Sequence, residues 1–238
     1  MKLKILSLNC WLLPPPFSSK NRKRIHQIIE LIKEINPDII ALQEVWLNHY
    51  VNLIKGNLKE YYFFESNSKI FNRSGLLTGL KIKPKSFHPV FFPPLKNYNF
   101  IEGFCSKGYQ IIKISKDTYF INTHLYSPLN REELKFNISQ WKLLKGRMGR
   151  KNVILSGDLN LDEKDFSKEE YPFNYQNEDG LKKPENNKYT KMKLNRLYEY
   201  YDEEDYILKN FKKGSLGVRK LYSHVLSDHY PLLGKLEI

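Results

Sequence analysis

Six short polar motifs along the chain hold the side-chain types that a hydrolytic reaction could use. The motifs are Asn9; Gln43 and Glu44; Thr123 and His124; Gly157, Asp158, Leu159 and Asn160; Asp205; and Ser227, Asp228 and His229. Carboxylate and amide oxygens are ligands that hard cations such as Mg²⁺ prefer, and imidazoles exchange protons near neutral pH. Metal-assisted hydrolysis of a phosphodiester uses this set of groups. Any one motif could arise by chance, so only the ordered set predicts such chemistry.

Short apolar runs, typical of buried strands, come before nearly all of these motifs. Residues 2–8, 39–42 and 153–155 lead into the first, second and fourth motif respectively. Because such strands deliver the residues that follow them to an edge of the sheet, we expect the polar side chains to lie together at one rim.

Three helices are expected where apolar residues recur at helical spacing. They fall within residues 22–35, 47–58 and 134–144, and Pro37 ends the first. Asn130 and Glu133 have the form of a capping box before the third. Further strands are predicted at residues 61–65, 75–82, 108–114, 119–122, 206–208, 218–225 and 232–238, with a long polar excursion over residues 162–204.

This order of elements predicts an α/β (α+β) fold with two mixed sheets packed face to face and helices outside. A single doubly wound sheet would need more crossover helices than the middle of the chain offers. We therefore expect a four-layer sandwich. One domain over residues 1–238 is expected, because no repeat or linker divides the sequence.

The chain is strongly basic, with 39 Lys and Arg against 26 Asp and Glu and a net charge of +13. Such an excess favours an anionic partner, either nucleic acid or an acidic membrane surface. A solvated basic surface without a partner is an equally good explanation, because the lysines are dispersed. Hydrophobic residues at 41% and charged residues at 27% argue against disorder.

Cysteine usage and the N-terminal segment bear on the compartment. Cys10 and Cys105 are too few for a disulfide framework, so a reducing compartment is the default. The first residues could pass for a short signal peptide, but Asn9 interrupts the apolar stretch where a small residue is wanted. No segment approaches the roughly 20 apolar residues of a membrane span. A cytoplasmic location is therefore expected.

Seven segments carry a resemblance to a known family. They are residues 6–11, 37–46, 107–108, 122–125, 156–160, 205–207 and 227–232. Together they resemble the endonuclease/exonuclease/phosphatase superfamily, which shares the deoxyribonuclease I fold. The Asn-Cys-Trp of the first segment, the Gln-Glu-Val-Trp of the second and the Lys107-Gly108 pair are most similar to the neutral sphingomyelinase branch.

A metal site is expected around Glu44, with Asn9 beside it and Asp228 nearby. Mg²⁺ keeps several waters and needs only one or two carboxylates plus a substrate phosphate, which suits this sparse set. The expected cofactor is therefore Mg²⁺, with Mn²⁺ as a substitute. The resemblance further implies that Asp158 and Asn160 orient the attacking water and a phosphate oxygen, while His124 donates to the developing oxyanion.

The resemblance also implies an acid–base pair. His229 would act as the general base, with Asp205 hydrogen-bonded to its other ring nitrogen to fix the tautomer. The family commonly has an Arg and an apolar residue before this Asp, whereas Glu203 and Glu204 stand here. Asp202 is therefore the alternative partner of His229.

Simpler explanations exist for each motif on its own. A Glu after an apolar strand is usually a solvated strand end, and residues 158–160 could form a plain turn with side-chain hydrogen bonds. His124 alone would more often be structural than catalytic. Because the motifs occur as an ordered set, the functional interpretation is favoured. His26, His49, His88 and His224 have no such context and are expected to be structural or surface residues.

The sequence says least about the substrate. Residues 86–104 are rich in aromatic residues and proline, and Phe91 and Phe92 could touch a membrane surface. A hairpin whose aromatic side chains pack back on the sheet is slightly favoured instead. A basic cluster could track a nucleic-acid backbone, although such a run is more often a solvated helix end. It consists of Lys142, Lys145, Arg147, Arg150 and Lys151.

Three hypotheses follow from these observations. The first is an Mg²⁺-dependent, sphingomyelinase-like phospholipase C that acts on a phospholipid. The second is a nuclease or DNA-repair phosphodiesterase of the same fold. The third is an inactive binding module, which would not require the retained carboxylates and imidazoles. The sequence does not determine the oligomeric state.

Overall fold

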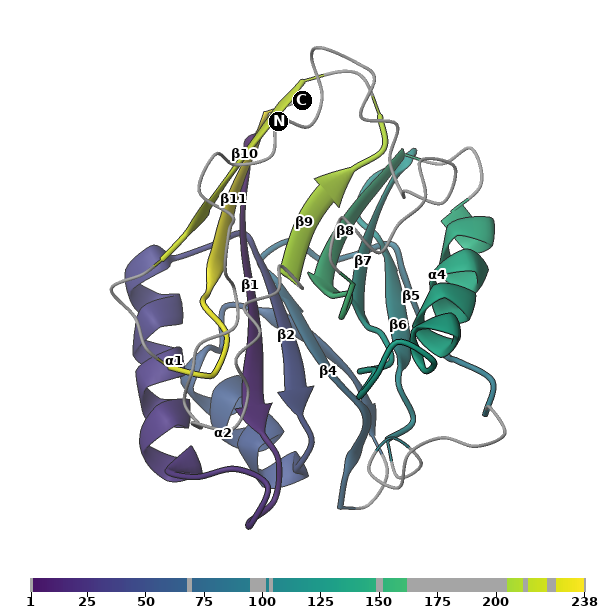
Figure 1. The fold of residues 1–238 in the computed structure, drawn as a ribbon. Helices are drawn as coiled ribbons and strands as arrows, with labels where there is room; N and C mark the ends of the chain where they lie inside the picture. Colours follow the sequence, from purple (N-terminus) through teal and green to yellow (C-terminus); the bar gives the residue numbers. More distant parts are fainter. Residues whose placement is uncertain are drawn as a thin grey trace.

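Two β-sheets pack face to face, and helices cover their outer sides (Figure 1). The computed structural model describes residues 2–67, 70–94, 102, 105–148, 152–161, 205–211, 214–221 and 226–237. The predicted excursion over 162–204, together with Asp202, Arg150, Lys151 and His224, lies outside these residues. The predicted four-layer sandwich of two mixed sheets is confirmed.

The first sheet has six strands. Across the sheet they are β10 (Ser215–Lys220), β11 (Leu232–Glu237), β1 (Lys2–Leu12), β2 (Ile39–Val45), β4 (Asn72–Leu80) and β3 (Tyr62–Asn67). Helices α1 (Asn21–Ile35) and α2 (Asn48–Asn57) pack on its outer face.

The second sheet has five strands. In order they are β5 (Ser86–Phe91), β6 (Gly108–Lys113), β7 (Thr118–His124), β8 (Asn152–Asp158) and β9 (Asp205–Lys209). Helix α4 (Leu134–Met148) covers its outer face. Among the described strands only β1–β2 and β7–β8 are parallel pairs, so each sheet has one pair whose carboxyl ends share an edge.

The apolar patterns of the sequence explain these layers. On β2, Ile40 and Leu42 pack toward the helices, whereas Ile39 and Ala41 face the second sheet. A strand buried on both faces has a continuous apolar run, which is what residues 39–42 show. The first helix ends at Asn36, which adopts left-handed φ 50° and donates its N–H to the carbonyl of Ile32.

The segment before the third helix bears out its predicted cap. The Oδ1 of Asn130 accepts the backbone N–H of Glu133 at 3.0 Å, one half of the expected capping box. The regular helix then begins at Leu134.

The aromatic segment contains strand β5, for which no range was predicted although a hairpin was the favoured interpretation of this segment. Ser86–Phe91 forms β5 at the edge of the second sheet, where Pro89 can be tolerated because an edge strand need not donate every hydrogen bond. Phe92 is buried against Tyr109, with ring centroids 5.5 Å apart. Phe92 is therefore not exposed for the membrane contact considered through Phe91 and Phe92, and the favoured interpretation, in which the aromatics pack back on the sheet, describes Phe92.

A chain of buried amide and hydroxyl groups joins the two sheets. Gln43 donates to the Oδ1 of Asn122 at 2.9 Å, and Asn122 donates to the Oγ1 of Thr78 at 3.0 Å. Thr78 in turn donates to Gln110 at 2.5 Å. All four residues have no exposed surface, so their polar groups have only each other and nearby backbone as partners. The chain fixes β2 and β4 relative to β6 and β7.

The described helices include none that is both long and apolar enough to cross a membrane.

Replacing Asn122 by Leu should lower the free energy of unfolding by ~1–3 kcal/mol, because Gln43 and Thr78 lose partners in a dry interior. Urea denaturation measures this loss. The matched control is Asn152→Leu at the exposed start of β8, which should change stability by less than about 0.5 kcal/mol. A double variant with Gln43→Leu should lose less than the sum of the single losses. Strict additivity would contradict a shared network.

Candidate active site

The predicted site residues gather where β1 and β2 end beside the ends of β7 and β8 (Figure 1). Asn9 lies opposite Gln43 in the first sheet, and His124 lies opposite Asp158 in the second. Asp205 begins β9, also opposite Asp158. Interatomic distances of 3.9 Å or less connect all eight: Asn9, Glu44, His124, Asp158, Asn160, Asp205, Asp228 and His229. The predicted rim is therefore present.

Asn9 links the two halves of the site. Its Nδ2 donates to the Oε1 of Glu44 at 3.0 Å and to the Oδ2 of Asp158 at 2.8 Å. Its Oδ1 accepts the backbone N–H of Trp11 at 3.0 Å, which fixes the orientation of the amide. Because Asn9 and Asp158 are each 1% exposed, water cannot take over these contacts.

Left-handed backbone conformations occur at the ends of three site strands. Trp11 has φ 48°, Glu44 has φ 56° and Asn160 has φ 48°. Only glycine adopts this region without steric cost, so each position is held there by its surroundings. At Trp11 it accompanies a register shift between Asn9 and Leu12, which lets β1 continue to Leu12 rather than end at residue 8 as predicted.

The turn after β8 orients Asp158. The Oδ1 of Asp158 accepts the backbone N–H of Asn160 at 2.9 Å, and the amide of Asn160 donates to the carbonyl of Leu125 at 3.0 Å. The plain turn considered from the sequence is thus real. It also aims the other oxygen of Asp158, Oδ2, at Asn9 and at His124, whose Nε2 lies 3.5 Å away.

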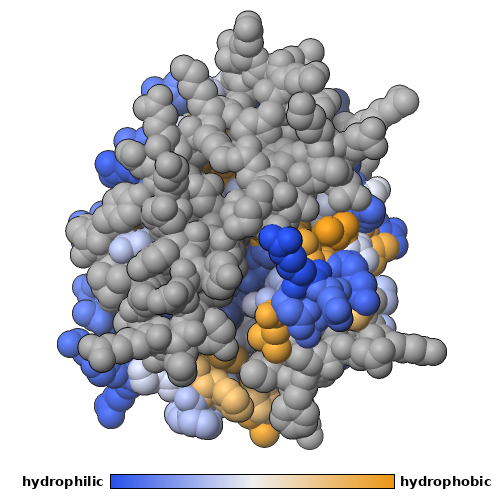
Figure 2. All heavy atoms as spheres, in the orientation of Figure 1, coloured by the Kyte–Doolittle hydropathy of each residue, from blue (hydrophilic) through white to orange (hydrophobic). Residues whose placement is uncertain are grey.

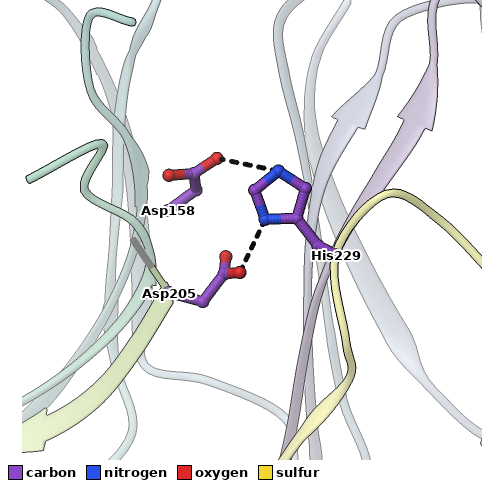
Figure 3. A group of neighbouring side chains, drawn as sticks. All are labelled: Asp158, Asp205 and His229. Carbon is purple, nitrogen blue, oxygen red and sulfur yellow. Dashed lines mark hydrogen bonds and ion pairs between the residues drawn. The ribbon is translucent and has the colours of Figure 1, made fainter. Parts of the chain in front are cut away.

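His229 lies between two carboxylates (Figure 3). Its Nδ1 is 2.7 Å from the Oδ2 of Asp205, and its Nε2 is 3.9 Å from the Oδ2 of Asp158. The Oδ1 of Asp228 is also 3.9 Å from Nε2. Burial by itself lowers the pKa of His229, but the charges of Asp205, Asp228 and Asp158, with the hydrogen bond to Asp205, raise the pKa well above its usual range. Asp205, rather than the alternative Asp202, is thus the partner that the structure shows.

Glu44 fits a cation better than it fits any protein partner. Burial raises the pKa of its carboxyl, the charge of Asp228 raises it further, and the hydrogen bond from Asn9 opposes the rise. Its buried Oε2 has no hydrogen-bond partner among the residues that the structure describes. Burying an unpaired carboxylate oxygen beside a second carboxylate costs free energy unless a cation binds there. Mg²⁺ and Mn²⁺ prefer such oxygen-rich sites. Glu44, with Asp228, could therefore hold such an ion.

A second group of ligand atoms also lies close together. In the described part of the chain, atoms of Asp158, Asp205 and His229 fall within 4.8 Å of one another. One imidazole nitrogen faces each carboxylate, however, so no single nitrogen is directed at both (Figure 3). We interpret this group as a proton-transfer chain and Glu44 as the metal-binding side of the site.

Lys107 is a buried residue of the Lys107-Gly108 motif, for which no role was predicted. Its Nζ pairs with the Oε1 of Glu102 at 2.7 Å and donates to the carbonyl of Leu125 at 2.8 Å. Burial alone lowers the pKa of Lys107, but the charge and hydrogen bond of Glu102 raise it, aided by Asp158. The next position requires glycine, because a Cβ at Gly108 would lie 2.0 Å from the carbonyl oxygen of Val90.

Arg24, on α1, was missed by sequence reasoning. Its guanidinium donates to the carbonyls of Cys10 and Trp11, both at 2.6 Å, and to that of Leu226 at 3.3 Å. It therefore joins the end of β1 to the segment that carries Asp228. In the sequence Arg24 looks like any polar residue of an amphipathic helix, and its burial is visible only in the structure.

The model of the endonuclease/exonuclease/phosphatase family matches residues 6–177. A Caenorhabditis elegans protein named as a candidate neutral sphingomyelinase is 27% identical over 189 residues, covering 68% of this chain and 42% of that protein. The chain thus spans less than half the length of this curated relative.

Three solved structures share the fold. SmcL aligns with TM-score 0.77 at 16% identity, covering 99% of each chain. A Staphylococcus aureus beta toxin variant with bound magnesium ions gives 0.74 at 19%, covering 100% of each. D. rerio TDP2 complexed with a single-strand DNA product gives 0.73 at 18%, covering 100% of this chain and 99% of that one. With the family model matched over most of its sequence, the chain belongs to the endonuclease/exonuclease/phosphatase family.

Proposed function

We propose that the protein hydrolyses a phosphodiester with the help of a divalent cation, Mg²⁺ by preference, and that its substrate is a phospholipid cleaved in the manner of a phospholipase C. The observation that carries the proposal is the position of His229. One of its nitrogens is held by Asp205, and the other faces Asp158 and Asp228 near the unpaired oxygen of Glu44.

The chemistry needs both a base and positive charge. A phosphodiester anion repels the attacking oxygen and expels a poor leaving group, so charge must be neutralised in the transition state. A cation held by Glu44, with Asn9 and Asp228 beside it, would supply that neutralisation. Asn9 cannot be a free ligand through its amide nitrogen, because that group donates to Glu44 and Asp158. Its role in this site is to fix both carboxylates.

The Nε2 of His229 removes the proton from the attacking water. Asp205 accepts the hydrogen of Nδ1 and so leaves Nε2 as the basic atom. Asp158 lies 3.9 Å from Nε2, a gap that one water can bridge with hydrogen bonds to both groups. His124, 3.5 Å from the same carboxylate, donates to the phosphate oxygen on which charge develops.

A phospholipid is favoured over nucleic acid by two observations. The sequence relative is named as a neutral sphingomyelinase. The Asn-Cys-Trp, Gln-Glu-Val-Trp and Lys107-Gly108 motifs are also most similar to that branch. The described members of the basic cluster considered for nucleic acid, Lys142, Lys145 and Arg147, lie in the second half of α4 and are exposed. Because α4 leads into the start of β8, these residues are at the edge opposite the site.

Nucleic acid is the second candidate, since the net charge of +13 suits any polyanion and a protein of this fold binds a single-strand DNA product. A side-by-side assay ranks the lipid and nucleic-acid candidates. Its substrates are sphingomyelin vesicles, abasic duplex DNA and soluble phosphodiesters, each tested with EDTA and with metal added back. Turnover of duplex DNA alone would favour the second candidate.

His229→Gln should lower the rate constant by ~10²–10⁴-fold without unfolding the protein, because the general base is lost. Steady-state hydrolysis of a soluble phosphodiester measures the loss, and circular dichroism confirms the fold. The control is His88→Gln on the exposed edge strand, which should keep full activity. Equal activity of the two variants would remove the proposed mechanism.

Glu44→Gln should weaken binding of Mg²⁺ or Mn²⁺ by at least about 100-fold, since the charged ligand is lost. Isothermal titration calorimetry on the metal-free protein measures this directly, without depending on turnover. The control is Glu132→Gln, an exposed carboxyl before α4. Unchanged affinity in Glu44→Gln would show that the ion is held elsewhere, with Asp158, Asp205 and His229 as the next group to test.

Metal affinity should fall as the pH is lowered, beginning at a higher pH than for an ordinary glutamate. Glu44 binds a cation only when ionised, and its pKa is raised, so protons compete with metal as the pH falls through that raised value. Above it, affinity is at its maximum. Calorimetry in buffers of different ionisation enthalpy should detect proton release on binding, which Glu44→Gln should remove. Affinity independent of pH would contradict the assignment.

A further inference from the structure

Large apolar side chains are exposed around the edge that holds the candidate site. Phe17 is 52% exposed, Ile70 65%, Phe71 48% and Leu129 67%. Phe17 follows β1, Ile70 and Phe71 precede β4, and Leu129 follows β7. Since β1 and β7 end, and β4 begins, at this edge, the four residues belong to connecting segments on the same side of the sheets as the site.

The turn before β4 is tied directly to the metal-binding side of the site. The backbone N–H of Asn48 donates to the carbonyl of Ile70 at 3.0 Å, and that of Asn72 donates to the carbonyl of Trp46 at 2.8 Å. Trp46 is two residues after Glu44. The backbone of residues 70–72 is thus held by the segment that follows β2, the strand that carries Glu44. Figure 2 shows apolar side chains uncovered at the lower end of the molecule, where β1 and β2 end in Figure 1.

The second sheet extends the same surface. The guanidinium of Arg73 lies over the ring of Phe91, 4.8 Å from its centroid, so the start of β4 meets the end of β5. Phe91 is partly buried, and Pro93 and Pro94 beyond it are exposed. Apolar surface therefore continues from one sheet to the other at this edge.

The segments around Phe17, Ile70 and Phe71 carry only positive charge, whereas the segment of Leu129 carries Arg131 with Glu132 and Glu133. Residues 11–23, 46–49, 70–73 and 91–94 contain no Asp or Glu. They carry Lys20, Arg22, Lys23 and Arg73, all exposed. Exposed apolar side chains with cations near Phe17, Ile70 and Phe71 match the interface of an anionic membrane, where apolar side chains enter the acyl boundary and cations meet lipid headgroups. Single-stranded nucleic acid fits less well, because Ile70 and Leu129 have no ring on which a base could stack.

We propose that the edge formed by Phe17, Ile70, Phe71 and Leu129, called here the apolar rim, docks on the surface of an anionic membrane. Docking this edge presents the site to phosphodiesters held in the lipid layer. The proposal rests on the proposed function where it names the substrate as lipid in a surface, whereas docking itself requires no catalysis. The apolar rim replaces the contact through Phe92 that the sequence suggested.

Partition onto vesicles tests the apolar rim. The protein carries His229→Gln so that lipid is not consumed, and it is sedimented with vesicles of phosphatidylcholine and phosphatidylserine. Ile70→Ser combined with Phe71→Ser should reduce the partition coefficient by at least about tenfold, because two exposed apolar side chains no longer enter the lipid. The chain offers a matched control in Tyr62→Ser with Ile82→Ser, which are 47% and 41% exposed at the opposite edge. That pair should change partition by less than about twofold.

The remaining measurements separate the proposals. With His229 intact, Ile70→Ser with Phe71→Ser should hydrolyse a soluble phosphodiester at the unaltered rate, since both side chains are exposed and neither is one of the proposed reacting groups. Unchanged partition in the rim variant, or equal loss in the control pair, would overturn the apolar rim. The apolar rim would also be overturned if the rim variant lost binding to a single-stranded oligonucleotide but kept its binding to vesicles. Rim-dependent partition without hydrolysis of vesicle lipid by the unsubstituted protein would uphold docking and refute the lipid hydrolase.

Discussion

The site depends on one amide group. Asn9 donates to Glu44 from its own sheet and to Asp158 from the other, so the two strand ends that carry the site are held at a fixed separation. Two carboxylates would otherwise repel each other across a dry gap, and the amide nitrogen gives each of them a hydrogen bond instead. An aspartate at this position would add a third negative charge, and a leucine would leave both oxygens unpaired.

The buried network behind the site makes this contact possible. Gln43 is adjacent to Glu44, and its hydrogen bond to Asn122 fixes β2 against β7 close to the hydrogen bonds that Asn9 donates. Apolar packing between sheets allows small sliding motions, whereas hydrogen bonds between buried groups have a defined partner and length. The sheets are therefore held in register by polar groups close to the place where the chemistry needs accuracy.

Much of this arrangement could be predicted from the sequence, and the rest depends on contacts between distant residues. The apolar runs and the residues that follow them locate β1, β2 and β8, because a buried strand has a strong local signal. Edge strand β5 has no such signal, since Pro89 and His88 interrupt it. The length of β1 depends on the left-handed Trp11, and the burial of Arg24 and Lys107 depends on carbonyls from other segments. Local pattern does not encode those partners.

The site is negatively charged, whereas the protein as a whole is positively charged. Glu44, Asp158, Asp205 and Asp228 surround His229 in a protein whose net charge is +13, so a concentrated negative site lies within a positive surface. The positive surface raises the local concentration of anionic substrates, while the negative site would repel the same anions. Burial and the charge of Asp228 raise the pKa of Glu44, and the charges of Asp205, Asp228 and Asp158 raise the pKa of His229 against its burial, so the site favours added positive charge. A divalent cation held by Glu44 and Asp228 would supply that positive charge and make the site attractive to a phosphodiester.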